Sequence, residues 1–95
     1  MTSLTAPRGE GLGRFDHALV ELPFLAEREK QVISARLGLD RGAPRSCTET
    51  ARMVHTSRDA VRRVEIIVGC KLRHPSAGAW EPKVSRLRDA LHGLS

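Results

Sequence analysis

Arginine side chains gather in one short stretch of the chain, directly after a serine that can begin a helix. Arg58, Arg62 and Arg63 all lie within six residues of Ser57. A guanidinium group can donate two parallel hydrogen bonds to guanine, and it also binds phosphate oxygens. A serine just before a helix accepts a hydrogen bond from an early backbone amide. These residue types at this spacing predict a helix whose first turns contact base edges in duplex DNA.

Positive charge is concentrated around this stretch. The chain of 95 residues has a formal net charge of +5. It holds only two Phe and one Trp, so it lacks the stacking platforms with which proteins bind single strands. Duplex DNA is therefore the expected partner, with Arg52 and Lys71 as phosphate contacts. Residues 45–75 carry seven cations (Arg45, Arg52, Arg58, Arg62, Arg63, Lys71, Arg73) against three acids (Glu49, Asp59, Glu65).

Two predicted helices joined by a tight turn carry these arginines. Ser46 and Glu49 have the spacing of a capping box, in which each side chain bonds a backbone amide of the other residue. His55 and Thr56 make the turn, and Ser57 caps the second helix. The predicted buried stripes are Cys47, Thr50, Ala51 and Val54 in the first helix, and Val61, Val64, Val68 and Leu72 in the second. The stretch from Ser46 to Pro75 is thus a predicted helix-turn-helix.

Two further helices are predicted before this motif. The first is a short amphipathic helix that Pro23 ends. The second runs from Leu25 to Leu37. Gly38 suits the left-handed conformation that often follows the last residue of a helix, and Leu39 can make the apolar contact that accompanies it. The stripe of the first helix consists of Phe15, Ala18, Leu19 and Leu22.

A last helix is predicted after a loop over Ser76 to Ala79. Pro82 suits its first turn. Its apolar residues, Val84, Leu87, Leu91 and Leu94, recur at three- and four-residue steps. The sequence has no strand pattern, so the expected fold is all-α, with four to five helices. We expect a flexible arm over residues 1–13, a helix-turn-helix domain over 14–75 and a C-terminal extension helix over 76–95.

Composition also bears on location and chemistry. The sequence has neither a membrane-spanning apolar run nor a signal-peptide pattern, so a cytoplasmic protein with reduced cysteines is expected. Cys70 and His74 are spaced as half of a metal site, but no second pair completes it. The other histidines have no neighbouring residues that suggest a catalytic triad. We therefore expect no metal, no cofactor and no enzymatic activity.

Three segments together resemble a known family. They are LAEREKQVISARLGLD from Leu25, SCTETARMVHTSRDAVRRVE from Ser46, and KLRHP from Lys71. They are similar to the C-terminal domain, region 4, of primary bacterial sigma factors (the sigma-70 family). The LRDAL run from Leu87 resembles the closing segment of such proteins.

The resemblance implies two partners. One is promoter DNA of the −35 type, read in the major groove. The other is the flap of the RNA polymerase β subunit, met by an apolar surface of the earlier helices, for which we name Leu25, Val32, Ile33 and Leu37.

The same resemblance assigns roles to residues of the second motif helix. Arg58 matches a base-contacting arginine, and Asp59 stands where the family has a glutamate that accepts from cytosine. Arg62 matches an arginine near the phosphates, and Ser57 matches the capping residue.

The departures from the family pattern affect which DNA bases the helix is expected to recognise. Ala60 replaces an arginine and Arg63 a glutamine, so the base preference is expected to differ or relax. Asp59 is one methylene shorter than the glutamate of the family, which limits its reach. His55 occupies a turn position where glycine is usual, at a modest conformational cost.

Ile66 and Ile67 form a second apolar stripe with Arg63 and Cys70, apart from the core stripe. Two explanations stand side by side. Either Trp80 and the last helix fold back over this stripe, or it is a docking face for a regulatory protein.

The sequence favours a stand-alone, region-4-like accessory or regulator of transcription initiation that binds promoter DNA and RNA polymerase. A first alternative is a sigma mimic that sequesters RNA polymerase, an anti-sigma factor or an activator without reading DNA. A second is a dimeric helix-turn-helix repressor whose leucine-spaced last helix is the dimer seam.

Overall fold

The computed structural model describes residues 18–94, and all regular secondary structure in that range is helical. The predicted all-α fold is therefore confirmed for these residues. The α-helices are α2 (Glu27–Leu37), α3 (Cys47–Met53), α4 (Arg58–Arg73) and α5 (Lys83–His92). Two 3₁₀ helices, η2 (Ala18–Val20) and η3 (Pro75–Trp80), complete the order.

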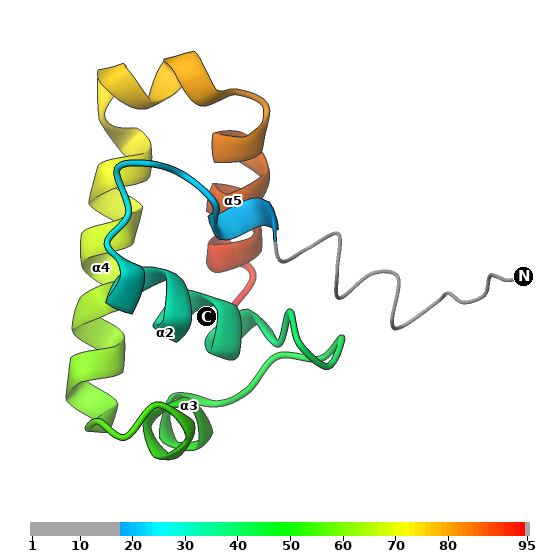
Figure 1. Cartoon of the computed structure of the whole chain (residues 1–95), viewed down its shortest axis with the longest axis vertical. Coiled ribbons are helices and arrows are strands. Elements are labelled where there is room, and N and C mark those ends of the chain that lie inside the picture. The colour runs from blue at the N-terminus through cyan, green and yellow to red at the C-terminus, as the bar shows by residue number, and fades with distance from the viewer. Residues whose placement is uncertain (1–17, 95) are drawn as a thin grey trace, which may run out of the picture.

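The long helix α4 is the spine of the molecule (Figure 1). Helix α5 runs back beside it in the opposite direction, and η3 joins the two at one end. Helix α2 crosses between them, and α3 lies at the far end, next to the start of α4. The helix-turn-helix is thus at one end of the spine, and the connection to α5 is at the other.

Buried side chains form two clusters. The larger joins α2, α4 and α5 and includes Ile33, Val68, Leu72 and Leu87, together with Leu22 from the segment before α2. The smaller, made of Val32, Ala51 and Val61, holds α3 against α2 and α4. The predicted core stripe of α4 is confirmed, since Val61, Val68 and Leu72 are buried and Val64 is half-buried.

Local sequence signals set the end of α2 and the start of α3. Gly38 has a φ of 70°, and a Cβ added there would lie 1.7 Å from the carbonyl oxygen of Ala43. Only glycine fits this turn, which directs the chain back toward α3. The capping box is present at the start of α3: Ser46 Oγ accepts from Glu49 N (3.0 Å) and Glu49 Oε1 accepts from Ser46 N (2.9 Å).

Two predicted elements differ from the structure. The amphipathic helix before Pro23 is only a three-residue 3₁₀ turn in its described part, and Phe15 lies outside the described residues. Leu22 is buried as expected, but Val20, which was not in the predicted stripe, is buried with it. The predicted loop over Ser76 to Ala79 is part of η3, in which Ala77 fills the core.

The last helix is confirmed near Pro82, but its apolar face points inward. Val84 and Leu87 are completely buried against α4, and Leu91 packs on the same cluster. Residues that fill the core of one chain cannot also form a seam with a second chain. Val84 and Leu87 are therefore not available to a dimer seam, which counts against the repressor alternative.

Candidate nucleic-acid interface

The predicted turn between α3 and α4 is confirmed in detail. His55 has a φ of 58°, so it takes the left-handed conformation that a glycine would adopt more easily. Ser57 caps α4, with its Oγ accepting a hydrogen bond from Ala60 N at 3.1 Å. These two residues set the direction in which α4 begins after the turn.

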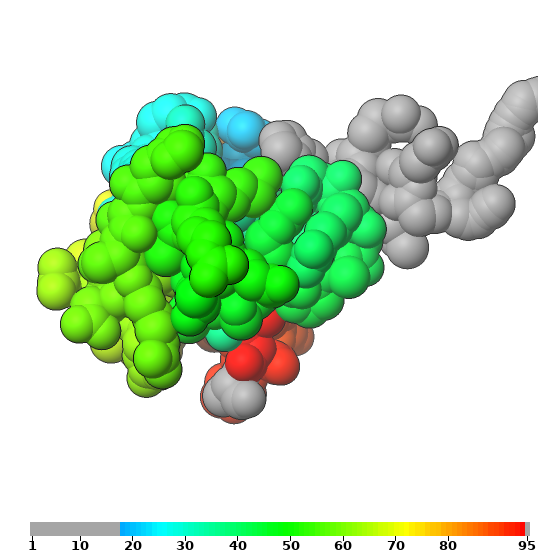
Figure 2. Space-filling view, turned by 90° about the horizontal axis from the view of Figure 1, so that it is seen from below, coloured from blue at the N-terminus to red at the C-terminus, as the bar shows by residue number. Residues whose placement is uncertain are grey.

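Basic side chains are exposed on this end. Arg58, Arg62 and Arg63 lie on the first turns of α4, and Arg52 lies on α3. All four are exposed, and none has a hydrogen-bond or ion-pair partner within residues 18–94. Figure 2 looks at the molecule from below, with α3 and the start of α4 toward the viewer. The four guanidinium groups thus lie on the two helices that form this surface and are free to bind a ligand.

Asp59 is the acidic residue of this surface. It is exposed on the first turn of α4, where a negative charge interacts favourably with the helix N-terminus. No ion pair within the described part of the chain occupies its carboxylate. Ala60 is half-buried beside it and offers no polar group.

Other arginines hold this surface in place. Arg28, on α2, donates to the carbonyl oxygen of Val54 at 2.6 Å, which ties the turn to α2. Arg36 Nε donates to Glu65 Oε2 at 2.7 Å, and another guanidinium nitrogen of Arg36 donates to the carbonyl oxygen of Arg45. The angle between α4 and the rest of the domain is therefore restrained by charged hydrogen bonds as well as by the core.

The loop between α2 and α3 has its own ion pair. Both guanidinium Nη atoms of Arg45 bond the Asp40 carboxylate, at 2.7 and 2.9 Å. These hydrogen bonds, together with the positive charge of Arg45, hold the pKa of Asp40 below its ordinary value. The same pairing raises the pKa of Arg45.

The structure does not place Lys71 with the other cations. Its Nζ atom bonds both carboxylate oxygens of Glu29, at 2.7 and 3.0 Å, and the carbonyl oxygen of Phe24 at 3.2 Å. Burial alone would raise the pKa of Glu29, but the hydrogen bond from Lys71 and that from Ala26 N lower it overall. Lys71 lies near the opposite end of α4 and is engaged by these bonds, so the structure gives no support to its predicted role as a phosphate contact.

The predicted apolar docking residues of the early helices are also placed differently. Leu25, Val32 and Ile33 are at most 5% exposed, and Leu37 packs against the core, so these side chains offer no surface to a partner. Their apolar character reflects packing inside the domain. The exposed apolar side chain of this region is Met53, at 48%.

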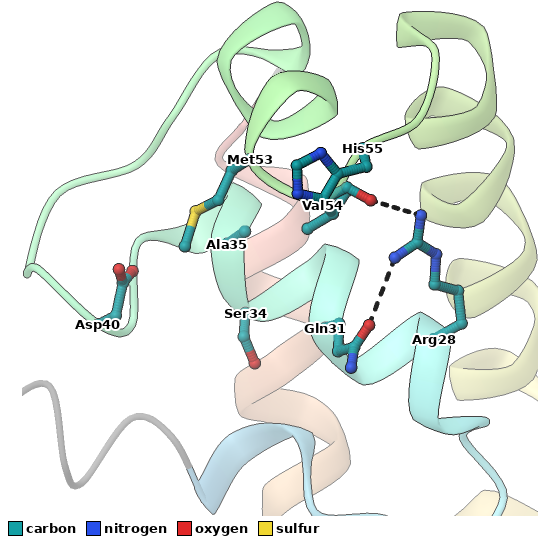
Figure 3. A pocket seen from close by; sticks show the side chains of 8 residues that line it. All are labelled: Arg28, Gln31, Ser34, Ala35, Asp40, Met53, Val54 and His55. Atoms are coloured by element: carbon teal, nitrogen blue, oxygen red, sulfur yellow. Dashed lines mark hydrogen bonds between the residues drawn. The ribbon is translucent and has the colours of Figure 1, made fainter.

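Met53 lines a pocket that sequence reasoning missed. The pocket has a volume of about 370 Å³ and lies between α2 and the turn of the helix-turn-helix (Figure 3). Gln31, Ser34 and Ala35 line it from α2, and Val54 and His55 from the turn. Its position could not be read from the sequence because the two sides are about twenty residues apart in the chain.

Ile66 and Ile67 remain exposed, at 64% and 41%. Trp80 is itself 43% exposed, and α5 packs on the buried stripe of α4 instead. Of the two explanations offered for this apolar pair, coverage by Trp80 and the last helix is therefore wrong.

Residues 18–94 hold no group of three or more His, Cys, Asp or Glu side chains arranged to bind a metal ion. None of the described helices has the length and apolar character needed to span a membrane.

The chain is similar to known proteins over most of its length. It is 37% identical over 70 residues to RNA polymerase sigma factor SigA of a Bacillus species, an alignment that covers 74% of this chain and 17% of that protein. The SigA proteins of Listeria monocytogenes and Listeria innocua are also 37% identical over 70 residues, covering 64% of this chain and 19% of theirs. The chain thus spans less than a fifth of the length of these relatives. No family model and no solved structure matches it.

Proposed function

We propose that this chain, which is related to the primary bacterial sigma factors and resembles their region 4, binds promoter-type duplex DNA and RNA polymerase as an accessory or regulator of transcription initiation. The observation that carries this proposal is the surface formed by Arg52, Arg58, Arg62 and Arg63. These four side chains are exposed, have no partner within residues 18–94, and surround the capped start of a helix.

The geometry of the helix-turn-helix supports insertion into the major groove. A recognition helix places its N-terminal side chains on base edges, and an arginine can bond guanine at two atoms. Arg58 is the first residue of α4, and Arg62 lies one turn later. In this arrangement Arg58 contacts a base, while Arg62 and Arg52 contact phosphates on either side. Asp59 and Arg63, both on the same turns, add an acceptor and a donor for neighbouring bases.

A second surface is proposed for the polymerase. The pocket between α2 and the turn is lined by the exposed apolar side chain of Met53, and the Arg28–Val54 hydrogen bond joins its two sides (Figure 3). An apolar segment of the β flap would fit this pocket in place of the buried residues named from sequence. Pull-down of RNA polymerase with and without the flap tip, repeated with Met53→Asp, tests this assignment.

Binding to a −35-type promoter duplex, measured by gel shift across a salt series, tests the DNA-reading part. Arg58→Ala is expected to weaken the specific complex by roughly tenfold or more, because one bidentate base contact is worth about 1–3 kcal/mol. The matched control is Arg86→Ala, since Arg86 is also exposed and unpaired within the described chain but lies on α5. Arg86→Ala should change the affinity for the promoter duplex little.

Two results would count against DNA reading. One is binding that is equally strong on unrelated duplexes and vanishes with salt. The other is an equal effect of the two arginine variants. If polymerase binding persisted in either case, the chain would instead be a mimic that occupies a sigma-binding surface.

A further inference from the structure

A groove runs along α4 beside α5, and Arg62 is the residue that it shares with the proposed DNA surface. Two hollows of about 240 and 520 Å³ form it, and Glu65 and Leu91 line both. Arg62 lies at one end of the groove and Arg73 at the other. At 1.5 Å per residue these positions are about 16 Å apart along α4, the length of three helical turns.

The floor of the groove is apolar. Ile66 and Leu72 contribute from α4 and Leu91 from α5. Ile66 is the most exposed large apolar side chain of the described chain, at 64%, and it borders this groove. Ile67 lines neither hollow. The groove therefore gives a reason for the exposure of Ile66 but not for that of Ile67.

The edges of the groove are positively charged. Arg73 and Arg88 line one end, and neither has a carboxylate within ion-pair distance in residues 18–94. Arg62 lies exposed at the other end, and no residue of the described part of the chain pairs with it. Glu65 is the one acidic side chain among the lining residues, and Arg36 already neutralises it at 2.7 Å. A ligand in the groove would meet unneutralised positive charge at both ends.

Gly69 gives an independent indication that the groove is kept open. A glycine inside a helix costs about 1 kcal/mol relative to alanine. Nothing in the described chain requires it, because a Cβ at this position would meet only Arg73 Nη1, at an ordinary contact distance of 3.7 Å. The missing side chain deepens the floor between Ile66 and Leu72.

We infer that this groove binds an acidic amphipathic helix of another protein. A helix laid along a groove between two helices places one apolar stripe on the floor, and its flanking side chains meet the edges. Carboxylates on that helix would complement Arg62, Arg73 and Arg88. A nucleic acid is the poorer fit, because its phosphates would lie over Ile66 and Leu91 without burying them.

The test uses a labelled synthetic peptide of about 14 residues, with leucines at helical spacing and glutamates at the other positions. The matched control is the same peptide with every glutamate replaced by lysine. Fluorescence anisotropy with the full chain is expected to show binding of the acidic peptide, weakened by added salt, and no binding of the lysine peptide.

Two pairs of variants locate the site. Gly69→Leu fills the floor without loss of helix propensity and should weaken peptide binding roughly tenfold or more, whereas Gly69→Ala should have a smaller effect. Arg88→Glu should weaken it similarly, while Arg86→Glu, on the same helix but outside the groove, should not. Gly69→Leu should leave binding to promoter duplex unchanged, which separates this proposal from the DNA-reading one.

Three outcomes would overturn the inference. They are equal binding of the two peptides, full binding by Gly69→Leu, and weakened duplex binding by Arg88→Glu in place of weakened peptide binding. Deletion of residues 1–17 supplies a further check. If the peptide bound only after this deletion, the chain's own N-terminal segment would be the occupant instead.

Discussion

Two groups of arginines around the helix-turn-helix have the same side chain and opposite roles. Arg28, Arg36 and Arg45 each bond a carbonyl oxygen of another element or loop, and Arg36 and Arg45 also bond a carboxylate. Arg52, Arg58, Arg62 and Arg63 have no partner in residues 18–94. The first group fixes the position of the helix-turn-helix, and the second is left available to a ligand.

The difference follows from where each residue lies. The paired arginines are on α2 and the loop after it, where the carbonyl ends of α2 and α3 and the carboxylate of Glu65 are within reach. The unpaired ones are exposed on α3 and α4, where no acceptor of residues 18–94 bonds them. This contrast predicts that variants of the first group lose stability and variants of the second lose DNA affinity.

The largest effect on stability is expected from Arg36→Ala. This change removes the bond to Glu65 and the bond to the carbonyl oxygen of Arg45, and it leaves the Glu65 carboxylate, whose side chain is 24% exposed, without its partner. Hydrogen bonds to charged groups contribute about 1.5–3 kcal/mol, so the free energy of unfolding should fall by roughly 2 kcal/mol. Urea unfolding followed by circular dichroism measures it. Arg58→Ala, a variant of the unpaired group, serves as the comparison. If Arg36→Ala lowered the free energy of unfolding no more than Arg58→Ala does, the distinction between the two groups would be wrong.

A smaller effect is expected when Asp40 is protonated. Its pKa is lower in the folded protein than in the unfolded chain, so its contribution to stability is fully present above the unfolded pKa, near 4, and is lost as pH falls through the folded pKa. Because the Asp40 side chain is 43% exposed and solvent screens its charge, the loss should be at most about 1 kcal/mol. Unfolding of the wild type and Asp40→Asn from pH 6 to pH 2 measures it. The variant should lose less stability on acidification, and parallel curves would contradict this.

The smallest effect on stability is expected from Arg52→Ala. Exposed substitutions without partners usually change the free energy of unfolding by less than about 0.5 kcal/mol. The expected signature is instead in DNA binding: the slope of log affinity against log salt concentration should decrease by about 1, since one phosphate contact is lost. Affinity should fall by a similar factor on every duplex. A loss confined to one promoter sequence would make Arg52 a base contact.

Local signals in the sequence predicted the elements that form the reading end. Ser46 with Glu49, Gly38, and Ser57 each act through hydrogen bonds or backbone geometry that involve residues three to five positions away. The sequence by itself therefore determined the helix-turn-helix and the exposure of its arginines. It also showed a mid-helix glycine at position 69, which was a readable signal for the groove and was missed.

Contacts between distant residues were decided only by the tertiary structure. Lys71 has the positive charge that a phosphate contact needs, yet its ammonium group bonds Glu29, 42 positions earlier in the chain. Leu25, Val32 and Ile33 are apolar whether they face a partner or the core, and packing placed them in the core. Ile66 and Trp80 are exposed because α5 packs on the other stripe of α4. Residue type and spacing determine which groups can interact, but the free energy of burying one face of α4 rather than another depends on the whole chain.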